Sequence, residues 1–259
     1  MKNMRLRDLP NFFRITGSDH TSSNFTADAI DRTGDAAATI VHTFKVLESD
    51  VFCTLSSMIP KKSTMGASNG WTRESMIYVN FGSIAFMTPP QLVEFAMGLA
   101  DSNQCFLWVL RLDSTNGDIA IFPEEFVEET REIGFLFGWC PQERVLYHPS
   151  IGGILTHCGW NSTIESLSAE VLMLYWPCFR DQLTNCKYIC DDWGAGLEID
   201  SNVKRDEVEW LVRELTEGEV GKKMRSKAME WKRMAEEAIG AKGPSSLNLD
   251  KLLDEVLSK

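Results

Sequence analysis

Residues 151–162 read Ile151-Gly152-Gly153-Ile154-Leu155-Thr156-His157-Cys158-Gly159-Trp160-Asn161-Ser162. The apolar first half of this stretch predicts a buried strand that ends at Thr156, and the polar residues 157–161 predict a turn after it. A helix is expected to start at Ser162, because Ser162 and Glu165 have the spacing of a capping box. The stretch therefore predicts a strand, a polar turn and a helix in direct succession, as in one unit of an α/β fold.

The turn and the start of this helix predict a binding site for an anion. The first amides of a helix have no carbonyl partner within it and carry the positive end of its dipole. His157, Asn161 and Ser162 add side-chain donors, and Gly159 lets a ligand approach the backbone closely. Taken alone, the Ser162–Glu165 spacing is typical of a helix cap, His157 of a core histidine, and tryptophans of core aromatics. Their joint arrangement around one turn favours binding.

The rest of the chain predicts an α/β fold with a Rossmann-like, doubly wound parallel sheet. Apolar runs typical of buried strands occupy residues 76–81, 105–110, 135–137, 151–156, 172–176 and 196–199. Helical patterns lie between them and continue over residues 220–239 and 246–257, and Thr88 before Pro89 is a good N-cap. Strands that are apolar throughout are typical of a parallel sheet covered on both faces, with ligands at the carboxyl ends of the strands. We expect this domain to span residues 75–240, with a C-terminal helix in 241–259.

The beginning of the chain has a different character. Residues 36–44 could form a strand and residues 46–56 a helix, but residues 1–57 offer too few elements for a core of their own. Residues 58–74 are rich in Gly, Ser and Lys, which is typical of a linker. We therefore interpret residues 1–57 as the remnant of another domain.

The composition narrows the class of partner. The chain is 44% hydrophobic and 24% charged with a net charge of -11, and such an acidic globular protein is a poor partner for nucleic acid or anionic membranes. No apolar run is long enough to span a bilayer, and residues 1–11 lack the apolar run of a secretory leader. The seven cysteines are an odd, scattered set, which predicts reduced thiols and a cytoplasmic location. Cys186 and Cys190 have no histidine in ligand spacing, so we expect no metal site.

Residues 139–182 contain a long motif with many fixed positions. It comprises Trp139, Pro141-Gln142, Val145-Leu146, His148, residues 157–162, Glu165, Pro177 and Asp181-Gln182. This pattern resembles the signature of the plant secondary-product UDP-glycosyltransferases, and the resemblance extends to residues 9–12, 80–83 and 185–259. It implies the C-terminal domain of a two-domain, GT-B-type glycosyltransferase, with residues 1–57 a partial N-terminal, acceptor-binding domain.

The resemblance also implies how a UDP-sugar would be held. Trp139 would stack on uracil, Cys140 would bind the base through its backbone, and Gln142 and Glu165 would bind the ribose hydroxyls. The diphosphate would contact Ser83, His157, Asn161 and Ser162, and the sugar would contact Trp160, Asp181 and Gln182. Trp160 and Gln182 match the glucose-preferring version. UDP-glucose would be the donor substrate, and no cofactor or metal is expected.

The chain departs from the family pattern in three places. Glu170 and Leu172 stand where the family has glycine and proline, and if Glu170 takes a left-handed conformation after the helix, that costs about 1 kcal/mol. Cys178 and Arg180 replace small or aromatic residues, and we expect Arg180 to point to solvent.

The third departure concerns catalysis. The family is inverting, and a histidine of its N-terminal domain, supported by an aspartate, deprotonates the acceptor hydroxyl. No segment here resembles that motif, and neither His20 nor His42 has a matching context. The sequence thus predicts a truncated UDP-glycosyltransferase, transferring glucose to a hydroxyl of a small plant metabolite, with impaired or no activity. The alternative is a non-catalytic UDP-sugar-binding fragment or an interaction partner of intact relatives.

Overall fold

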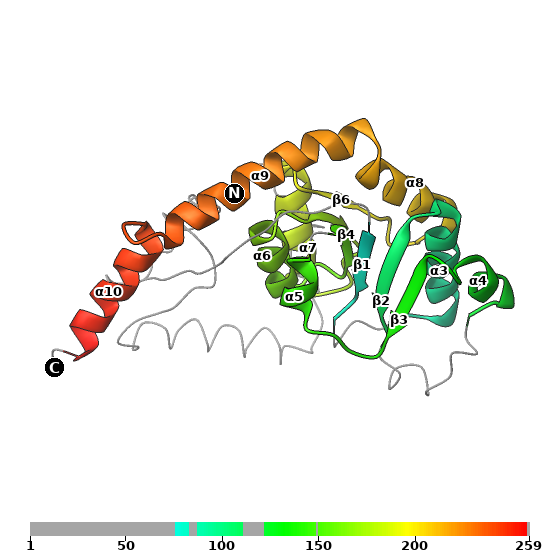
Figure 1. The fold of residues 1–259 in the computed structure, drawn as a ribbon, viewed down its shortest axis with the longest axis horizontal. Coiled ribbons are helices and arrows are strands. Elements are labelled where there is room, and N and C mark those ends of the chain that lie inside the picture. The colour runs from blue at the N-terminus through cyan, green and yellow to red at the C-terminus, as the bar shows by residue number, and fades with distance from the viewer. Residues whose placement is uncertain (1–75, 83–86, 111–121, 149, 258–259) are drawn as a thin grey trace, which may run out of the picture.

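The computed structural model describes residues 76–82, 87–110, 122–148 and 150–257 (Figure 1). The proposed remnant at 1–57, the linker at 58–74 and Ser83 lie outside these ranges. Within them the chain forms one six-stranded sheet with helices on both faces (Figure 1). The α/β prediction is confirmed.

All six strands are parallel and lie where the apolar runs predict them. They are β1 (Met76–Asn80), β2 (Cys105–Val109), β3 (Gly134–Phe137), β4 (Ile151–Thr156), β5 (Leu172–Tyr175) and β6 (Gly196–Glu198). Their order in the sheet is β3-β2-β1-β4-β5-β6. The first three strands extend the sheet to one side and the last three to the other, which is the doubly wound order. As a result β1 and β4 are neighbours at the centre.

The helices follow the predicted pattern closely. They are α3 (Pro89–Ser102), α4 (Glu124–Glu129), α5 (Gln142–Leu146), α6 (Trp160–Ser168), α7 (Gln182–Lys187), the π-helix η5 (Tyr188–Trp193), α8 (Arg205–Thr216), α9 (Glu219–Ile239) and α10 (Pro244–Leu257). Thr88 caps α3 as expected: its hydroxyl accepts the Gln91 N–H, and the Gln91 side chain accepts the Thr88 N–H. The capping box is thus complete.

The alternation of side chains along each strand divides the core into two layers. Ile77 and Val79 of β1 pack with Phe95 of α3 in the layer that also contains α4 and α8. Tyr78, between them, packs with Ile164 of α6 in the layer that also contains α5, α7 and η5. Figure 1 shows α3, α4 and α8 on one side of the sheet and α5, α6 and α7 on the other. Buried residues of α9 contact both layers, so this long helix joins them.

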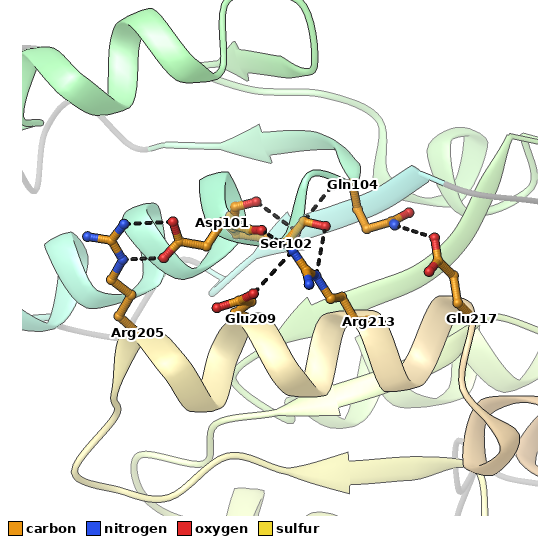
Figure 2. Close-up of polar contacts among 8 residues, drawn as sticks. Asp101, Ser102, Gln104, Arg205, Glu209, Arg213 and Glu217 are labelled. Atoms are coloured by element: carbon orange, nitrogen blue, oxygen red, sulfur yellow. Dashed lines mark hydrogen bonds and ion pairs between the residues drawn. The ribbon is translucent and has the colours of Figure 1, made fainter.

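Polar contacts connect α3 to α8 where the two helices pack (Figure 2). Arg205, at the start of α8, forms a two-bond ion pair with Asp101 near the end of α3. Arg213, two turns further along, donates to the main-chain carbonyls of Asp101 at 2.6 Å and Ser102 at 3.3 Å. Because those carbonyls lie in the last turn of α3, Arg213 caps its C-terminal end with a positive charge.

The two ends of α6 differ from each other in how well the sequence predicts them. The predicted start at Ser162 is wrong: Gly159 is the N-cap, in extended conformation, and the helix begins at Trp160. The Ser162–Glu165 spacing is therefore not a capping box. At the other end, Glu170 does take the left-handed conformation considered from the sequence, with φ 61°. The Val171 and Glu170 N–H groups donate to the carbonyls of Ser166 and Leu167, which is the Schellman pattern.

Candidate functional site

The candidate site lies at the carboxyl ends of β1 and β4, where the sheet changes winding direction. Asn80, the last residue of β1, is directly opposite Thr156, the last residue of β4. From there the chain leads from β1 to α3 on one face and from β4 to α6 on the other. Such a switch point leaves a crevice at the sheet edge, where open α/β sheets bind ligands. The sequence motif around His157 is thereby brought beside residues 80–82.

His157 fills the space between two glycines. A Cβ atom on Gly82 would lie 2.4 Å from the imidazole Cε1, and one on Gly159 would lie 2.7 Å from Nε2. Gly82 also has φ 70°, which favours glycine for a second reason. Thr156 Oγ1 and His157 Nδ1 are 3.3 Å apart and form a hydrogen bond. Glycine at both positions is therefore required by the imidazole.

The same confinement sets the protonation state of His157. Burial lowers its pKa, because the charged imidazolium loses solvation, and the negative charge of Asp181 opposes this effect only in part. The ring is therefore neutral near pH 7 and can donate one hydrogen bond. A neutral donor beside a helix N-terminus is suited to a phosphate oxygen.

The first turn of α6 supplies backbone donors next to His157. The Asn161 and Ser162 amides are too close to the start of the helix to reach a carbonyl within it. The Asn161 side chain is exposed, whereas Ser162 is buried. The helix N-terminus begins two residues before the predicted one, so these amides directly follow the glycine turn.

Gln142 joins the start of α5 to α6. Its Nε2 group donates to Ser162 Oγ at 3.0 Å and to Glu165 Oε2 at 2.8 Å. The side chains of Ser162 and Glu165, whose spacing suggested a capping box, are thus linked through a third residue. The Glu165 carboxylate is half-buried and has a second oxygen with which it can accept a ligand hydroxyl.

Tyr78 and Asn80 complete this network, and they are residues that the sequence interpretation did not include in the site. Asn80 Nδ2 donates to Gln142 Oε1 at 2.9 Å and to Tyr78 Oη at 2.8 Å. The Tyr78 hydroxyl contacts Cys140 Sγ at 3.4 Å, and burial raises the pKa of Tyr78, so the hydroxyl stays protonated. Asn80 could have been included from the sequence, because it is a polar residue at the carboxyl end of a strand, where ligands bind in parallel sheets.

The two tryptophans of the motif have different surroundings. Trp139 is 77% exposed, although it lies three residues before the well-anchored Gln142. Trp160 is half-buried, and its ring centroid lies 6.2 Å from that of Trp193 on η5. Trp139 therefore presents a free indole face, whereas Trp160 is held by its neighbours.

Asp181 and Gln182 lie at the start of α7. Gln182 is buried, and its Oε1 accepts the N–H groups of Cys178 at 2.9 Å and Phe179 at 3.0 Å, so a ligand would meet its amide nitrogen. Asp181 is exposed and accepts a hydrogen bond from Asn185 at 2.8 Å. Arg180 has a left-handed conformation, with φ 58°, and its guanidinium lies 5.8 Å from the centroid of the Phe179 ring. Arg180 is exposed, as expected.

Three thiols, those of Cys158, Cys186 and Cys190, lie in the same core layer, between the turn before α6 and the helices α7 and η5. The Sγ atoms of Cys186 and Cys190 are 3.8 Å apart and form a hydrogen bond, and Cys186 also contributes to raising the pKa of Cys158. All three are free thiols, and their environment raises the pKa of Cys158, mainly through burial, and of Cys190, mainly through the contact with Cys186. In the part of the chain that the structure describes, no group of three His, Cys, Asp or Glu side chains is arranged to hold a metal ion.

Comparison with known proteins identifies the family. The family model for "UDP-glucoronosyl and UDP-glucosyl transferase" matches residues 46–233. The chain belongs to this family.

Individual relatives agree with this assignment. The chain is 49% identical over 290 residues to a 7-deoxyloganetin glucosyltransferase from Gardenia jasminoides, covering 100% of this chain and 60% of that protein. It is 44% identical over 289 residues to an (R)-mandelonitrile beta-glucosyltransferase from Prunus dulcis, covering 99% and 60%. The structure of Phytolacca americana UGT2 complexed with UDP-2fluoro-glucose and pterostilbene matches with a TM-score of 0.83 at 31% identity, covering 97% of this chain and 59% of that one.

The fold of this family member is the Rossmann-like domain of a GT-B-type glycosyltransferase, as the sequence predicts. The chain spans about 60% of the length of the curated relatives it matches. None of the helices in the described ranges is both long enough and apolar enough to cross a membrane.

Proposed function

We propose that this chain is the donor-binding part of a UDP-glycosyltransferase and that it binds UDP-glucose at the carboxyl ends of β1 and β4. The proposed division of the chain is a remnant at 1–57, a linker at 58–74, the donor domain at 75–240 and a C-terminal helix in 241–259. The donor is a substrate, and the proposal requires no metal or other cofactor. Free thiols throughout the described residues support a cytoplasmic location.

Each part of the donor has a matching set of groups in this proposal. Trp139 stacks on uracil, and Cys140 meets the base through its backbone. Gln142 and Glu165 bind the ribose hydroxyls. The diphosphate is bound by His157 and by Asn161 and Ser162 at the start of α6, and Ser83, which lies outside the described residues, is proposed as a further contact. Trp160, Asp181 and Gln182 face the glucose. Neutral donors and a helix N-terminus can hold a diphosphate even in a chain with a net charge of -11.

One observation carries the proposal. An indole that is 77% exposed stands three residues before an amide that bonds to two side chains of α6. The exposed indole offers a flat face on which a nucleotide base can stack, and it lies in the segment that Gln142 connects to the first turn of α6. The acceptor is proposed to be a small plant metabolite with a free hydroxyl, since the relatives named above are glucosyltransferases of such compounds.

The test is isothermal titration of UDP into the wild-type chain and into Trp139→Ala. Base stacking is worth about 1–3 kcal/mol, so the variant should bind UDP roughly 5- to 150-fold more weakly. Trp210→Ala is the matched control, because Trp210 on α8 is 60% exposed and lies outside the proposed site. Equal affinity of the wild type and Trp139→Ala would remove the stacking role.

A further inference from the structure

Asn80 connects three separate segments of the donor site. Its Oδ1 accepts the Gly82 N–H at 2.9 Å, which fixes the turn that follows β1. Its Nδ2 donates to Gln142 Oε1 at 2.9 Å, which reaches the start of α5. Gln142 in turn contacts α6 through Ser162 and Glu165. Asn80 is half-buried, so these bonds are partly shielded from competing water.

The contacts of Asn80 decide which way the amide of Gln142 faces. An amide has a donor end and an acceptor end of nearly the same shape, and only its partners distinguish them. Asn80 Nδ2 can only donate, so it selects the Oε1 end of Gln142. The Nε2 end then faces Ser162 and the Glu165 carboxylate, which needs a donor. With the amide reversed, an amide oxygen would face the carboxylate, and two amide nitrogens would face each other.

We propose that Asn80 is a positioning residue of the donor site, which orients Gln142 and through it the Glu165 carboxylate toward the ribose hydroxyls, while holding the Gly82 turn against His157. The inference rests on the proposed function, because it assumes that Glu165 meets a ribose. Asn80 itself need not touch the ligand. One side chain thus couples the ribose end of the site to the phosphate end, since Gly82 packs on His157.

The experiment compares two ligands in the full chain: UDP, and 2′,3′-dideoxy-UDP, which lacks both ribose hydroxyls. In the wild type, two hydrogen bonds to the hydroxyls should make UDP bind about tenfold or more tightly than the dideoxy ligand. Asn80→Asp has the same shape and keeps an oxygen for the Gly82 N–H, but it cannot donate to Gln142. The preference for UDP should fall to roughly two- to threefold. Any general repulsion by the new charge acts on both ligands and leaves their ratio unchanged.

Asn80→Ser provides the second variant, because it is uncharged, too short to reach Gln142, and expected to fold even if Asn80→Asp does not. The ratio of the affinities for UDP and for 2′,3′-dideoxy-UDP should also decrease in Asn80→Ser. Asn103→Ala is the matched control: Asn103 is the left-handed C-cap of α3, so its loss should lower the unfolding midpoint without changing the ratio.

The outcomes distinguish this inference from the proposed function. A wild type that binds neither ligand overturns both. A wild type that prefers UDP, with that full preference retained in Asn80→Ser or a folded Asn80→Asp, overturns the role of Asn80 alone. A narrowed ratio in the Asn80 variants, beside an unchanged ratio in Asn103→Ala, supports it.

Discussion

The imidazole of His157 is enclosed by glycine on two sides, and this packing has a consequence for pH dependence. Burial lowers the pKa of His157 in the folded chain, whereas an imidazole in the unfolded chain titrates near its ordinary value of about 6.5. Between these two values the unfolded state binds more protons than the folded state, so the free energy of unfolding decreases as the pH falls. The stability associated with the neutral ring is present above about pH 6.5 and is lost below it.

We therefore expect wild-type protein to lose more stability than His157→Gln between about pH 7.5 and about pH 5.5, on either side of the ordinary imidazole pKa. Urea unfolding midpoints at the two pH values provide the measurement. Glutamine is neutral throughout this range, so it removes the titration while keeping a polar side chain. Identical pH dependence in the two proteins would contradict the buried, neutral state of His157.

At the scale of single residues, the sequence predicted which side chains gather but not how their polar ends pair. Gln142, Ser162 and Glu165 belong to one sequence motif, and they meet beside the crevice at the carboxyl ends of β1 and β4. Their bonds depend on which end of the Gln142 amide faces α6, and that depends on Asn80, which is 62 residues away along the chain. Spacing within a motif contains no information about such a distant partner. The capping-box prediction failed for a more local reason, because Gly159 and not Ser162 is the N-cap of α6.

At the scale of secondary-structure elements, strands were easier to predict than helix starts. The central strands of a parallel sheet are continuous apolar runs, so their limits can be recognised directly. Helix α6 begins with Trp160 and Asn161, which are not strong helix formers, so its start was placed two residues late. The strand order and the π-helix η5 depend on contacts between distant segments, and no local pattern predicts them.

The end of α6 gives a prediction about the ion pair between Glu170 and Lys232 of α9. Their side chains are 12% and 14% exposed, and Lys232 Nζ lies 2.9 Å from Glu170 Oε2. Glu170→Gly should relieve about 1 kcal/mol of left-handed strain. It would also leave a nearly buried ammonium without its partner, which costs about 3 kcal/mol. Loss of the pair is the larger effect, so Glu170→Gly should lower the free energy of unfolding by about 2 kcal/mol.

Glu170→Gly combined with Lys232→Met removes both the strain and the orphaned charge, and it should be at least as stable as the wild type. Urea unfolding of the single and double variants tests this, with Lys227→Gln as the control. Lys227 pairs with Glu230 on the same helix, but both side chains are largely exposed, so that variant should differ little from the wild type. A single variant Glu170→Gly that is more stable than the wild type would show that strain is the larger effect.

At the scale of the whole molecule, donor binding and glucose transfer should separate. The groups that would hold UDP-glucose lie within the described residues, apart from Ser83. The sequence contains no segment that resembles the motif around the family's catalytic histidine. General-base catalysis by such a residue contributes about 10²–10⁴-fold to the rate of reaction. We therefore expect the chain to bind UDP but to form no glucoside at a useful rate.

An assay with UDP-glucose and a mixed panel of phenolic and alcohol acceptors, followed by mass spectrometry, tests this expectation. Transfer that appears only when the N-terminal domain of a relative is supplied would support it. Robust transfer by the chain alone, abolished in His20→Ala or His42→Ala, would contradict it, because one of these histidines would then act as the base. Binding without transfer under every condition would favour the alternative, a non-catalytic UDP-sugar-binding protein.

The cluster of Cys158, Cys186 and Cys190 provides a chemical means of detecting ligand binding at the proposed donor site. Alkylating reagents react with the thiolate, and a thiol that is both buried and of raised pKa reacts only when its surroundings open. Cys158 precedes the glycine turn directly and is fully buried, so its rate of alkylation measures how often the turn before α6 separates from α7. A ligand that holds the turn closed slows that reaction. Binding can thus be followed by the mass of one modified peptide, without a labelled ligand or any substitution in the chain.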